Sequence, residues 1–337
     1  MSRSSCLLLL GLLLGACATD DPPPGAGVYY WKANWAFTAA DRTLAQRVGF
    51  ERLYLRLFDL DWDPGSQSTQ PRGPVELPAD LVNVAELELT PVVFIVNRVF
   101  TYDPDPVALA AKTAAGIQKF SAAHPELARA TEWQIDCDWT PSTRDAYFSF
   151  LRELQKQRPG LHLSVTVRLH QYREREENGI PPVASGLLMC YNFLPVGDPH
   201  SANAIFDLAL LRGYLKAPPY PLPLDAALPL FEWGAAFRNE ELVGLVDAPV
   251  GTENYLLPTA PGRYLLRRDT TLAGTFLRAG DALRYDGPQD HATLLEATAL
   301  LRQKAEIRSL LFFDWQPELI EKYRVPELIS TFAATEK

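Results

Sequence analysis

The stretch Glu132-Trp133-Gln134-Ile135-Asp136-Cys137-Asp138-Trp139-Thr140-Pro141 decides the fold. It reads as a short apolar strand that becomes a polar turn where two acids appear, one residue apart. Side chains alternate between the two faces of a strand, so Asp136 and Asp138 are expected on one face and Cys137 on the other. Two carboxylates at the end of a strand that feeds a helix are typical of the catalytic face of a (β/α)8 barrel. The alternative is an acidic turn that only caps the helix.

The helix after these acids is expected over Asp145–Gln157, where the residue pattern is amphipathic. Thr140, Ser142 or Thr143 offers its N-cap, because a hydroxyl can accept a hydrogen bond from the first turn of a helix. The chain therefore passes directly from the acidic strand end into a helix.

The rest of the chain repeats this alternation of strand and helix. Eight short apolar runs are predicted as strands, at Val28–Trp31, Arg52–Phe58, Pro91–Val96, Trp133–Asp138, His162–Leu169, Gly186–Tyr191, Leu228–Trp233 and Ser309–Phe313. Helices are predicted at Ala39–Val48, Ala79–Glu88, Pro106–His124, Asp145–Gln157, Ala204–Lys216, His291–Ile307 and Glu318–Phe332. Most of the strand runs are continuously apolar, as expected for parallel strands covered on both faces. The pattern predicts an α/β fold, a TIM barrel, over a doubly wound open sheet, which usually has fewer strands.

Two places interrupt the alternation. After the fifth strand, the charged segment Gln171–Val183 leaves a short helix or none. After the seventh, residues 239–290 are too long for a simple loop and form a small β-rich insertion, with strands expected at Arg263–Arg268, Thr271–Leu277 and Ala282–Tyr285. The insertion either walls one side of the barrel mouth or is an exposed decoration without ligand contact.

The N-terminus reads as a targeting segment. Arg3, an apolar run and Gly15-Ala16-Cys17 follow the layout of a secretory signal over residues 1–16. Leu14-Gly15-Ala16-Cys17 resembles the bacterial lipobox, which implies a lipid on Cys17, and Ala18 after it favours the outer membrane. Residues 17–27 then form a proline-rich tether, and 28–337 form the barrel domain. The sequence thus predicts a protein of the bacterial cell envelope held by an N-terminal lipid anchor, with a plain cleaved signal peptide as the alternative.

Charge and composition exclude several classes of partner. A net charge of −9 and a pI near 5.2 argue against nucleic acid, which requires a basic face. No His cluster, CxxC or nucleotide-binding fingerprint occurs, so neither metal nor cofactor is expected. Cys137 and Cys190 lie in strands that are not neighbours and are predicted as buried free thiols. The oligomeric state is left open.

Aromatic and polar residues are predicted to gather at the barrel mouth. Six tryptophans fall at strand ends and together suggest a stacking surface for sugar rings, although each alone would more often be core: Trp31, Trp35, Trp62, Trp139, Trp233 and Trp315. Further substrate-binding candidates are Arg168, His170, Tyr191 and Asn192. The catalytic candidates are Asp136, Asp138, Glu232 and Asp314, because a hydrolase needs one protonated and one ionised carboxyl. A glycan is the expected partner.

Three of these strands resemble those of the family 18 glycoside hydrolases. Ile135-Asp136-Cys137-Asp138 resembles the end of that family's DxxDxDxE motif, Leu188-Met189-Cys190-Tyr191-Asn192 its MxYD strand, and Leu311-Phe312-Phe313-Asp314-Trp315 its last strand. That family also often carries a small α+β insertion after strand seven. Over Val28–Phe332, the chain resembles a bacterial lipoprotein family known as domain of unknown function 3142. The resemblance implies a barrel with a sugar ligand.

Two departures from the family 18 pattern bear on function. Thr140 stands where the family has its proton-donating Glu, and Asn192 replaces the acid of strand six. The first hypothesis is a glycoside hydrolase in which Asp138 or its neighbour donates the proton, Asp136 assists, and Glu232 or Asp314 supplies the second carboxylate. The second is a glycan-binding lipoprotein without catalysis. The third is an envelope scaffold whose rim tryptophans are simply core.

Overall fold

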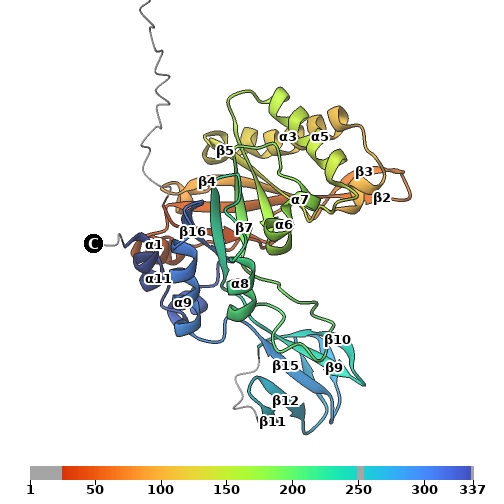
Figure 1. Ribbon diagram of the computed structural model, residues 1–337, viewed down its shortest axis with the longest axis vertical. Helices are drawn as coiled ribbons and strands as arrows, with labels where there is room; N and C mark the ends of the chain where they lie inside the picture. Colours follow the sequence, from red (N-terminus) through yellow and green to blue (C-terminus); the bar gives the residue numbers. More distant parts are fainter. Residues whose placement is uncertain (1–24, 249–253, 335–337) are drawn as a thin grey trace, which may run out of the picture.

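The computed structural model describes residues 25–248 and 254–334, so the predicted signal peptide and Cys17 lie outside the described residues. Eight parallel strands form a closed barrel, because β1 pairs with β2 on one side and with β16 on the other. In chain order they are β1 (Gly27–Tyr30), β2 (Arg52–Asp63), β4 (Glu88–Ile95), β5 (Glu132–Asp136), β6 (His162–Arg168), β7 (Ser185–Met189), β8 (Leu224–Pro229) and β16 (Ile307–Phe313). The predicted TIM barrel is confirmed (Figure 1).

Helices between the strands cover the barrel from outside (Figure 1). They are α1 (Ala39–Val48), α2 (Arg98–Thr101), α3 (Pro106–Ala123), α4 (Pro125–Ala128), α5 (Arg144–Gln157), α6 (Leu169–Arg173), α7 (Arg175–Asn178), α8 (Leu208–Tyr214), α9 (His291–Arg302), α10 (Pro317–Lys322) and α11 (Val325–Ala333). The pair α6 and α7 confirms the short helical segment predicted after the fifth strand. Thr143 takes the N-cap position of α5, but its side chain accepts no hydrogen bond from the helix.

Two predicted helices are shorter in the structure, Ala204–Lys216 being α8 and His291–Ile307 being α9, and two others differ more. The helix expected over Ala79–Glu88 is only the 3-10 turn η1 (Val82–Val84), because Glu88 already pairs with Arg52 in the barrel sheet. The preceding residues are taken up by β3 (Ser68–Arg72), which returns antiparallel along the extended end of β2. The last predicted helix divides into α10 and α11, since Arg324 adopts a left-handed backbone (φ 50°) just before Pro326.

The seventh barrel strand lies earlier than predicted. Leu224–Pro229 pairs with β7 and β16, whereas the prediction placed the strand at Leu228–Trp233. The apolar run continues on both sides of Pro229, so its composition alone does not mark where the strand ends. After Pro229 the chain leaves the barrel, and Trp233 begins a strand of a second sheet.

The second sheet lies outside the barrel, beyond α8 in Figure 1. Its five strands, in spatial order, are β10 (Glu241–Val246), β9 (Trp233–Arg238), β15 (Ala282–Asp286), β12 (Arg263–Leu266) and β11 (Leu256–Ala260). A separate hairpin joins β13 (Thr270–Leu272) to β14 (Thr275–Leu277), so the strand expected over Thr271–Leu277 is two. The second sheet has a small apolar core of its own, which includes Val246, Leu256 and Leu283.

The side chains of β5 alternate between the two faces of the sheet, as predicted. Gln134 accepts a hydrogen bond from Tyr29 inside the barrel, and Asp136 accepts one from Thr166 on β6. Cys137 is buried and free, as is Cys190, which confirms the prediction for both thiols. Among the described residues, none of the helices is both long and apolar enough to span a bilayer.

Candidate functional site

A cleft of about 460 Å³ lies at the carboxyl ends of the barrel strands. Residues in or directly after seven of the eight strands line it: Trp31, Ala33, Arg56, Asp59, Phe94, Asp136, Asp138, Arg168, Met189, Tyr191, Asn192 and Phe313. This is the face where TIM-barrel proteins place their functional residues, since the loops after the strands converge there. The cleft therefore brings together five residues predicted from the polar strand ends: Asp136, Asp138, Arg168, Tyr191 and Asn192.

Asp136 is the most buried charged group of the cleft. Its residue is only 6% exposed, and its Oδ1 accepts a hydrogen bond of 2.6 Å from Thr166 Oγ1. Burial, and next the nearby carboxylate of Asp138, raises the pKa of Asp136 to about 7. Loss of water disfavours the charged form of an acid, and a second negative charge does the same. Near neutral pH, this carboxyl therefore holds a proton that it can donate.

Asp138 lies in a different electrostatic environment. Both of its carboxylate oxygens accept from Arg168, with Arg168 Nη2 2.7 Å from Oδ2 and Nε bonded to Oδ1. A bidentate guanidinium partner favours the ionised carboxylate. The two acids of this stretch therefore face the same cleft with different partners, a threonine hydroxyl for Asp136 and a guanidinium for Asp138. Arg168, predicted as a substrate-binding residue, thus forms an ion pair with Asp138.

A second arginine–aspartate pair lines the cleft from β2. Arg56 Nη2 lies 2.7 Å from Asp59 Oδ2, and Arg56 Nε lies 2.8 Å from Asp59 Oδ1. Arg56 was not among the predicted site residues. Arg56 interrupts an otherwise apolar run of β2. A charged residue inside a strand that is covered on both faces is unusual, so this position could have been predicted as a functional residue from the sequence.

Aromatic rings form one wall of the cleft. Trp31 lies 5.5 Å from Phe313 and 6.5 Å from Phe94, measured between ring centroids. Tyr191 stacks on Phe313 at 4.9 Å. This wall suits the apolar face of a ring-shaped ligand, and Arg56, Asp59 and Asn192 supply hydrogen-bonding groups around it.

Of the six tryptophans predicted at the mouth, only Trp31 lines the cleft. Trp139 and Trp315 are 0% and 2% exposed, and their rings pack against other aromatic rings, Trp139 on α5 and Trp315 against Phe37 and Phe50 on either side of α1. Trp139 donates to the Asn178 carbonyl, and Trp315 donates to Asp41. The indoles of the other three pack elsewhere: Trp35 against Tyr30 and Phe37, Trp62 against Tyr102, and Trp233 against Phe231. The predicted ring of six stacking tryptophans is wrong.

Two predicted catalytic acids lie outside the cleft. Glu232 follows β8 by three residues and binds Lys322 Nζ at 2.7 Å and the hydroxyl groups of Tyr285 and Tyr323. Asp314 follows the cleft residue Phe313 but does not line the cleft itself, and burial raises its pKa to about 6. Both predictions assumed that an acid at a strand end points into the mouth, which requires the strand to end at that residue.

His170 and Thr140 are also absent from the cleft lining. The chain turns into α6 at Leu169, so His170 lies exposed on this helix and not at the end of β6. Thr140 Oγ1 lies 2.9 Å from Ser142 Oγ within the turn before α5. No described residue of β9 to β15 lines the cleft either, so the second sheet does not wall this site.

The residues from 25 to 248 and from 254 to 334 contain no group of three His, Cys, Asp or Glu side chains placed to hold a metal ion. The chemistry available in the cleft is that of carboxyl, guanidinium, amide and aromatic groups.

Several solved structures share this fold. The spore cortex-lytic enzyme SleL of Bacillus cereus matches with a TM-score of 0.56 and 15% identity, over 93% of this chain and 75% of that chain. A family 18 chitinase from Cycas revoluta matches with a TM-score of 0.47 and 14% identity, over 92% of this chain and 100% of its own. A fungal endo-β-N-acetylglucosaminidase of family 18 matches with a TM-score of 0.49 and 9% identity, over 92% of this chain and 98% of its own.

Comparison with family models and with curated proteins finds no match. The resemblance to the lipoprotein family therefore stays a prediction. The likeness to SleL shows that the two chains share one fold.

Proposed function

We propose that the barrel mouth binds a glycan and hydrolyses a glycosidic bond, with Asp136 as the proton donor. The observation that carries this proposal is the pair Asp136 and Asp138, which share one cleft under opposite electrostatic conditions. Two carboxyl groups whose environments separate their pKa values are the usual acid and base of such hydrolases. The aromatic wall of Trp31, Phe94 and Phe313 supports a sugar ring as the ligand.

In this mechanism Asp136 gives its proton to the glycosidic oxygen as the bond between that oxygen and the anomeric carbon breaks. The ionised Asp138, held by Arg168, stabilises the positive charge that develops on the sugar, and water adds to the anomeric carbon. Asp136, left as the carboxylate when the bond breaks, takes up the proton that the attacking water releases, which restores the acid. These roles reverse those predicted from the sequence, where Asp138 was the favoured donor, because the more deeply buried carboxyl is the one that keeps its proton.

The test is the release of reducing ends from chito-oligosaccharides and peptidoglycan fragments by the purified full-length protein. These glycans are chosen because the strand motifs resemble those of family 18 chitinases and because SleL is a spore cortex-lytic enzyme. Asp136→Asn should lower the rate by about two to four orders of magnitude, the usual contribution of a general acid. Asp314→Asn and Glu232→Gln are matched controls, expected to leave the rate near that of the unchanged protein. Full activity of Asp136→Asn would rule out the assigned donor.

Glycan binding without hydrolysis is the second candidate, and two observations favour it. Thr140 takes the place of the family 18 Glu and hydrogen-bonds within its own turn, and Arg168 occupies both oxygens of Asp138. Saturable binding of oligosaccharide with no release of reducing ends would support this candidate. Asp136→Asn would then change affinity little, whereas Trp31→Ala would weaken it.

We also propose, from the sequence, that the protein is exported and anchored through an acylated Cys17 at the outer membrane. The lipobox-like stretch ending at Cys17 supports this proposal. Expression with radiolabelled palmitate, followed by separation of inner and outer membranes, tests it. Cys17→Ala should lose the label and leave the membrane fraction; a labelled Cys17→Ala protein would contradict the proposed anchor.

A further inference from the structure

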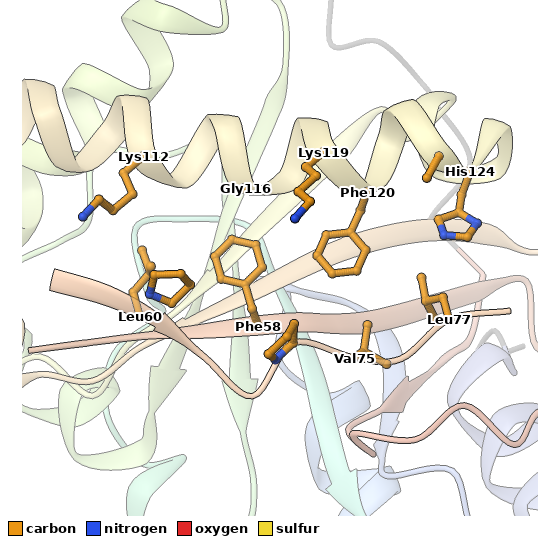
Figure 2. Close-up of a pocket in the computed structure, with 12 residues that line it drawn as sticks. Phe58, Leu60, Val75, Leu77, Lys112, Gly116, Lys119, Phe120 and His124 are labelled. Atoms are coloured by element: carbon orange, nitrogen blue, oxygen red, sulfur yellow. The ribbon is translucent and has the colours of Figure 1, made fainter. Parts of the chain in front are cut away.

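A second cavity, on the outer wall of the barrel, shares no lining residue with the mouth cleft. It has a volume of about 450 Å³ and lies between α3 and the segment that includes the β2–β3 hairpin and residues 73–77 (Figure 2). Phe58, Leu60, Val75, Leu77 and Phe120 form its apolar surface. We call it the α3 groove. Its volume falls in the range of small-molecule sites.

Gly116 is what allows the groove floor to approach the helix. A Cβ atom at this position would lie 2.4 Å from the ring carbon Cζ of Phe58, which is impossible without displacing the ring. The Phe58 ring therefore lies directly under the helix, stacked on Phe120 with a centroid distance of 6.2 Å and an interplanar angle of 10°. The two rings provide a flat apolar floor beneath the middle of α3.

Two cations border this apolar floor. Lys112 and Lys119 extend from α3 on the side of the groove (Figure 2). Lys112 Nζ donates to the backbone carbonyl of Thr69, and neither lysine has an acid partner among the described residues. In a chain with a net charge of −9, two lysines without acid partners next to an apolar groove are complementary to an anion.

The far end of the groove holds a buried polar group. His124 is 7% exposed and lines the groove, and its Nδ1 has no hydrogen-bond partner among the described residues. A buried polar atom without a partner costs stability, so a ligand that supplies the hydrogen bond would gain from it. Lys112 and His124 are separated along α3 by about 18 Å, since each residue of a helix rises about 1.5 Å.

From these contacts we propose that the α3 groove binds a single-chain amphipathic carboxylate. The carboxylate lies near Lys112 and Lys119, at the rim of the groove. The alkyl chain runs over Phe58 and Phe120 toward Val75 and Leu77. A hydroxyl group near the end of the chain reaches His124 Nδ1.

The test is calorimetric titration of the full-length protein with dodecanoate and with 12-hydroxydodecanoate. Both should bind with one site, and the hydroxylated chain should bind about threefold to tenfold more tightly, the usual gain from one hydrogen bond. His124→Phe should remove this difference between the two ligands. Lys119→Gln should weaken both by about threefold to fivefold, as expected for a partly exposed ion pair, and Arg152→Gln on α5 is the matched charge control.

A variant that fills the groove tests ligand binding there without changing any charge. Ala123 is exposed and lines the groove, so Ala123→Phe fills it without touching the core; the neighbouring exposed Ala122 does not line it, so Ala122→Phe is the matched control. Binding lost in Ala123→Phe and kept in Ala122→Phe supports the proposal. Absence of binding to either acid, or equal binding by both variants, overturns it.

Two sources of such a chain, free acid and membrane lipid, are separated by flotation with vesicles of phosphatidylglycerol. Titration by dodecanoate without vesicle binding assigns the groove to a free acid, and vesicle binding that Ala123→Phe abolishes assigns it to a lipid chain. Self-association in sedimentation that Ala123→Phe removes, without binding of either acid, would overturn the proposal in favour of a second copy of the protein.

Discussion

At the scale of single residues, the site depends on the contrast between Asp136 and Asp138. Their side chains are close enough to interact electrostatically. Asp136 is buried and accepts a hydrogen bond from Thr166, whereas Asp138 is held by the guanidinium of Arg168. The local sequence places both on one face. The contrast between them comes from β6, which supplies both Thr166 and Arg168.

The first prediction concerns the dependence of stability on pH. The pKa of Asp136 rises from an ordinary 3.8 to about 7 on folding, so the folded protein keeps a proton that the unfolded chain releases. This stabilisation is complete below about pH 4 and is lost as the pH rises through about 7. Asp136→Asn cannot ionise, so the variant should exceed the unchanged protein in unfolding free energy at pH 8 by about 1 kcal/mol or more.

Urea denaturation at pH 5 and pH 8 measures this effect. Glu132 also has a pKa raised to about 7 by burial, so both proteins should lose stability on going to pH 8. Only the difference between the two proteins reports on Asp136. If that difference is the same at pH 5 and pH 8, the carboxyl is not protonated in the fold.

The second prediction separates two tryptophans that look alike in sequence. Trp31→Ala should weaken oligosaccharide binding about tenfold, because a ring of the cleft wall is lost, while Trp315→Ala should leave the affinity unchanged. Trp315 is 2% exposed, so its truncation should instead cost about 3–5 kcal/mol of unfolding free energy. Calorimetric titration and urea denaturation of both variants check this. Equal affinities would remove Trp31 from the binding site.

At the scale of elements, α3 illustrates how packing overrides helix propensity. Alanine is normally preferred to glycine inside a helix by about 1 kcal/mol. At Gly116, however, an added methyl group meets the Phe58 ring of β2. The residue therefore joins the helix layer to the barrel sheet, and only the folded structure reveals its role.

The third prediction follows from this contact. Gly116→Ala should lower the unfolding free energy by about 1–3 kcal/mol, as overpacking usually does. Gly213 in α8 is the matched control, since a Cβ atom added there would meet no neighbouring segment within 4 Å, and Gly213→Ala should raise stability by about 0.5–1 kcal/mol. Thermal or urea unfolding of the two variants is sufficient. A Gly116→Ala protein as stable as Gly213→Ala would show that the Phe58 ring moves at little cost.

At the scale of the whole molecule, the end of the barrel opposite the cleft is joined by a buried ionic network. Arg52 on β2 binds Asp225 on β8 at 2.8 Å and also contacts Tyr54 and the Ser309 hydroxyl of β16. Arg52 and Asp225 are 173 positions apart in the chain. The network therefore connects the first and last parts of the sheet, whose pairing closes the barrel.

The fourth prediction tests this connection. Arg52→Met should destabilise the fold by about 3 kcal/mol, because it leaves the buried Asp225 carboxylate with only the longer contact to Arg308, 3.5 Å away. Arg52→Met/Asp225→Leu should recover much of the loss. The exposed pair of Arg47 and Glu321 is the control, and Arg47→Met should change stability by at most about 1 kcal/mol. Chemical denaturation of the unchanged protein and these three variants measures the differences. A double variant no more stable than Arg52→Met would contradict the proposed pairing.

The sequence alone determined the barrel, since each apolar run followed by an amphipathic segment reports on its own local structure. It also determined that Asp136 and Asp138 share a face, because strand alternation is a property of neighbouring residues. Only the tertiary structure decided that Glu232, Asp314 and His170 lie outside the cleft and that Trp139 and Trp315 are core. The direction of a side chain beyond a strand end depends on where pairing with the next strand stops, and burial depends on which distant helix covers it.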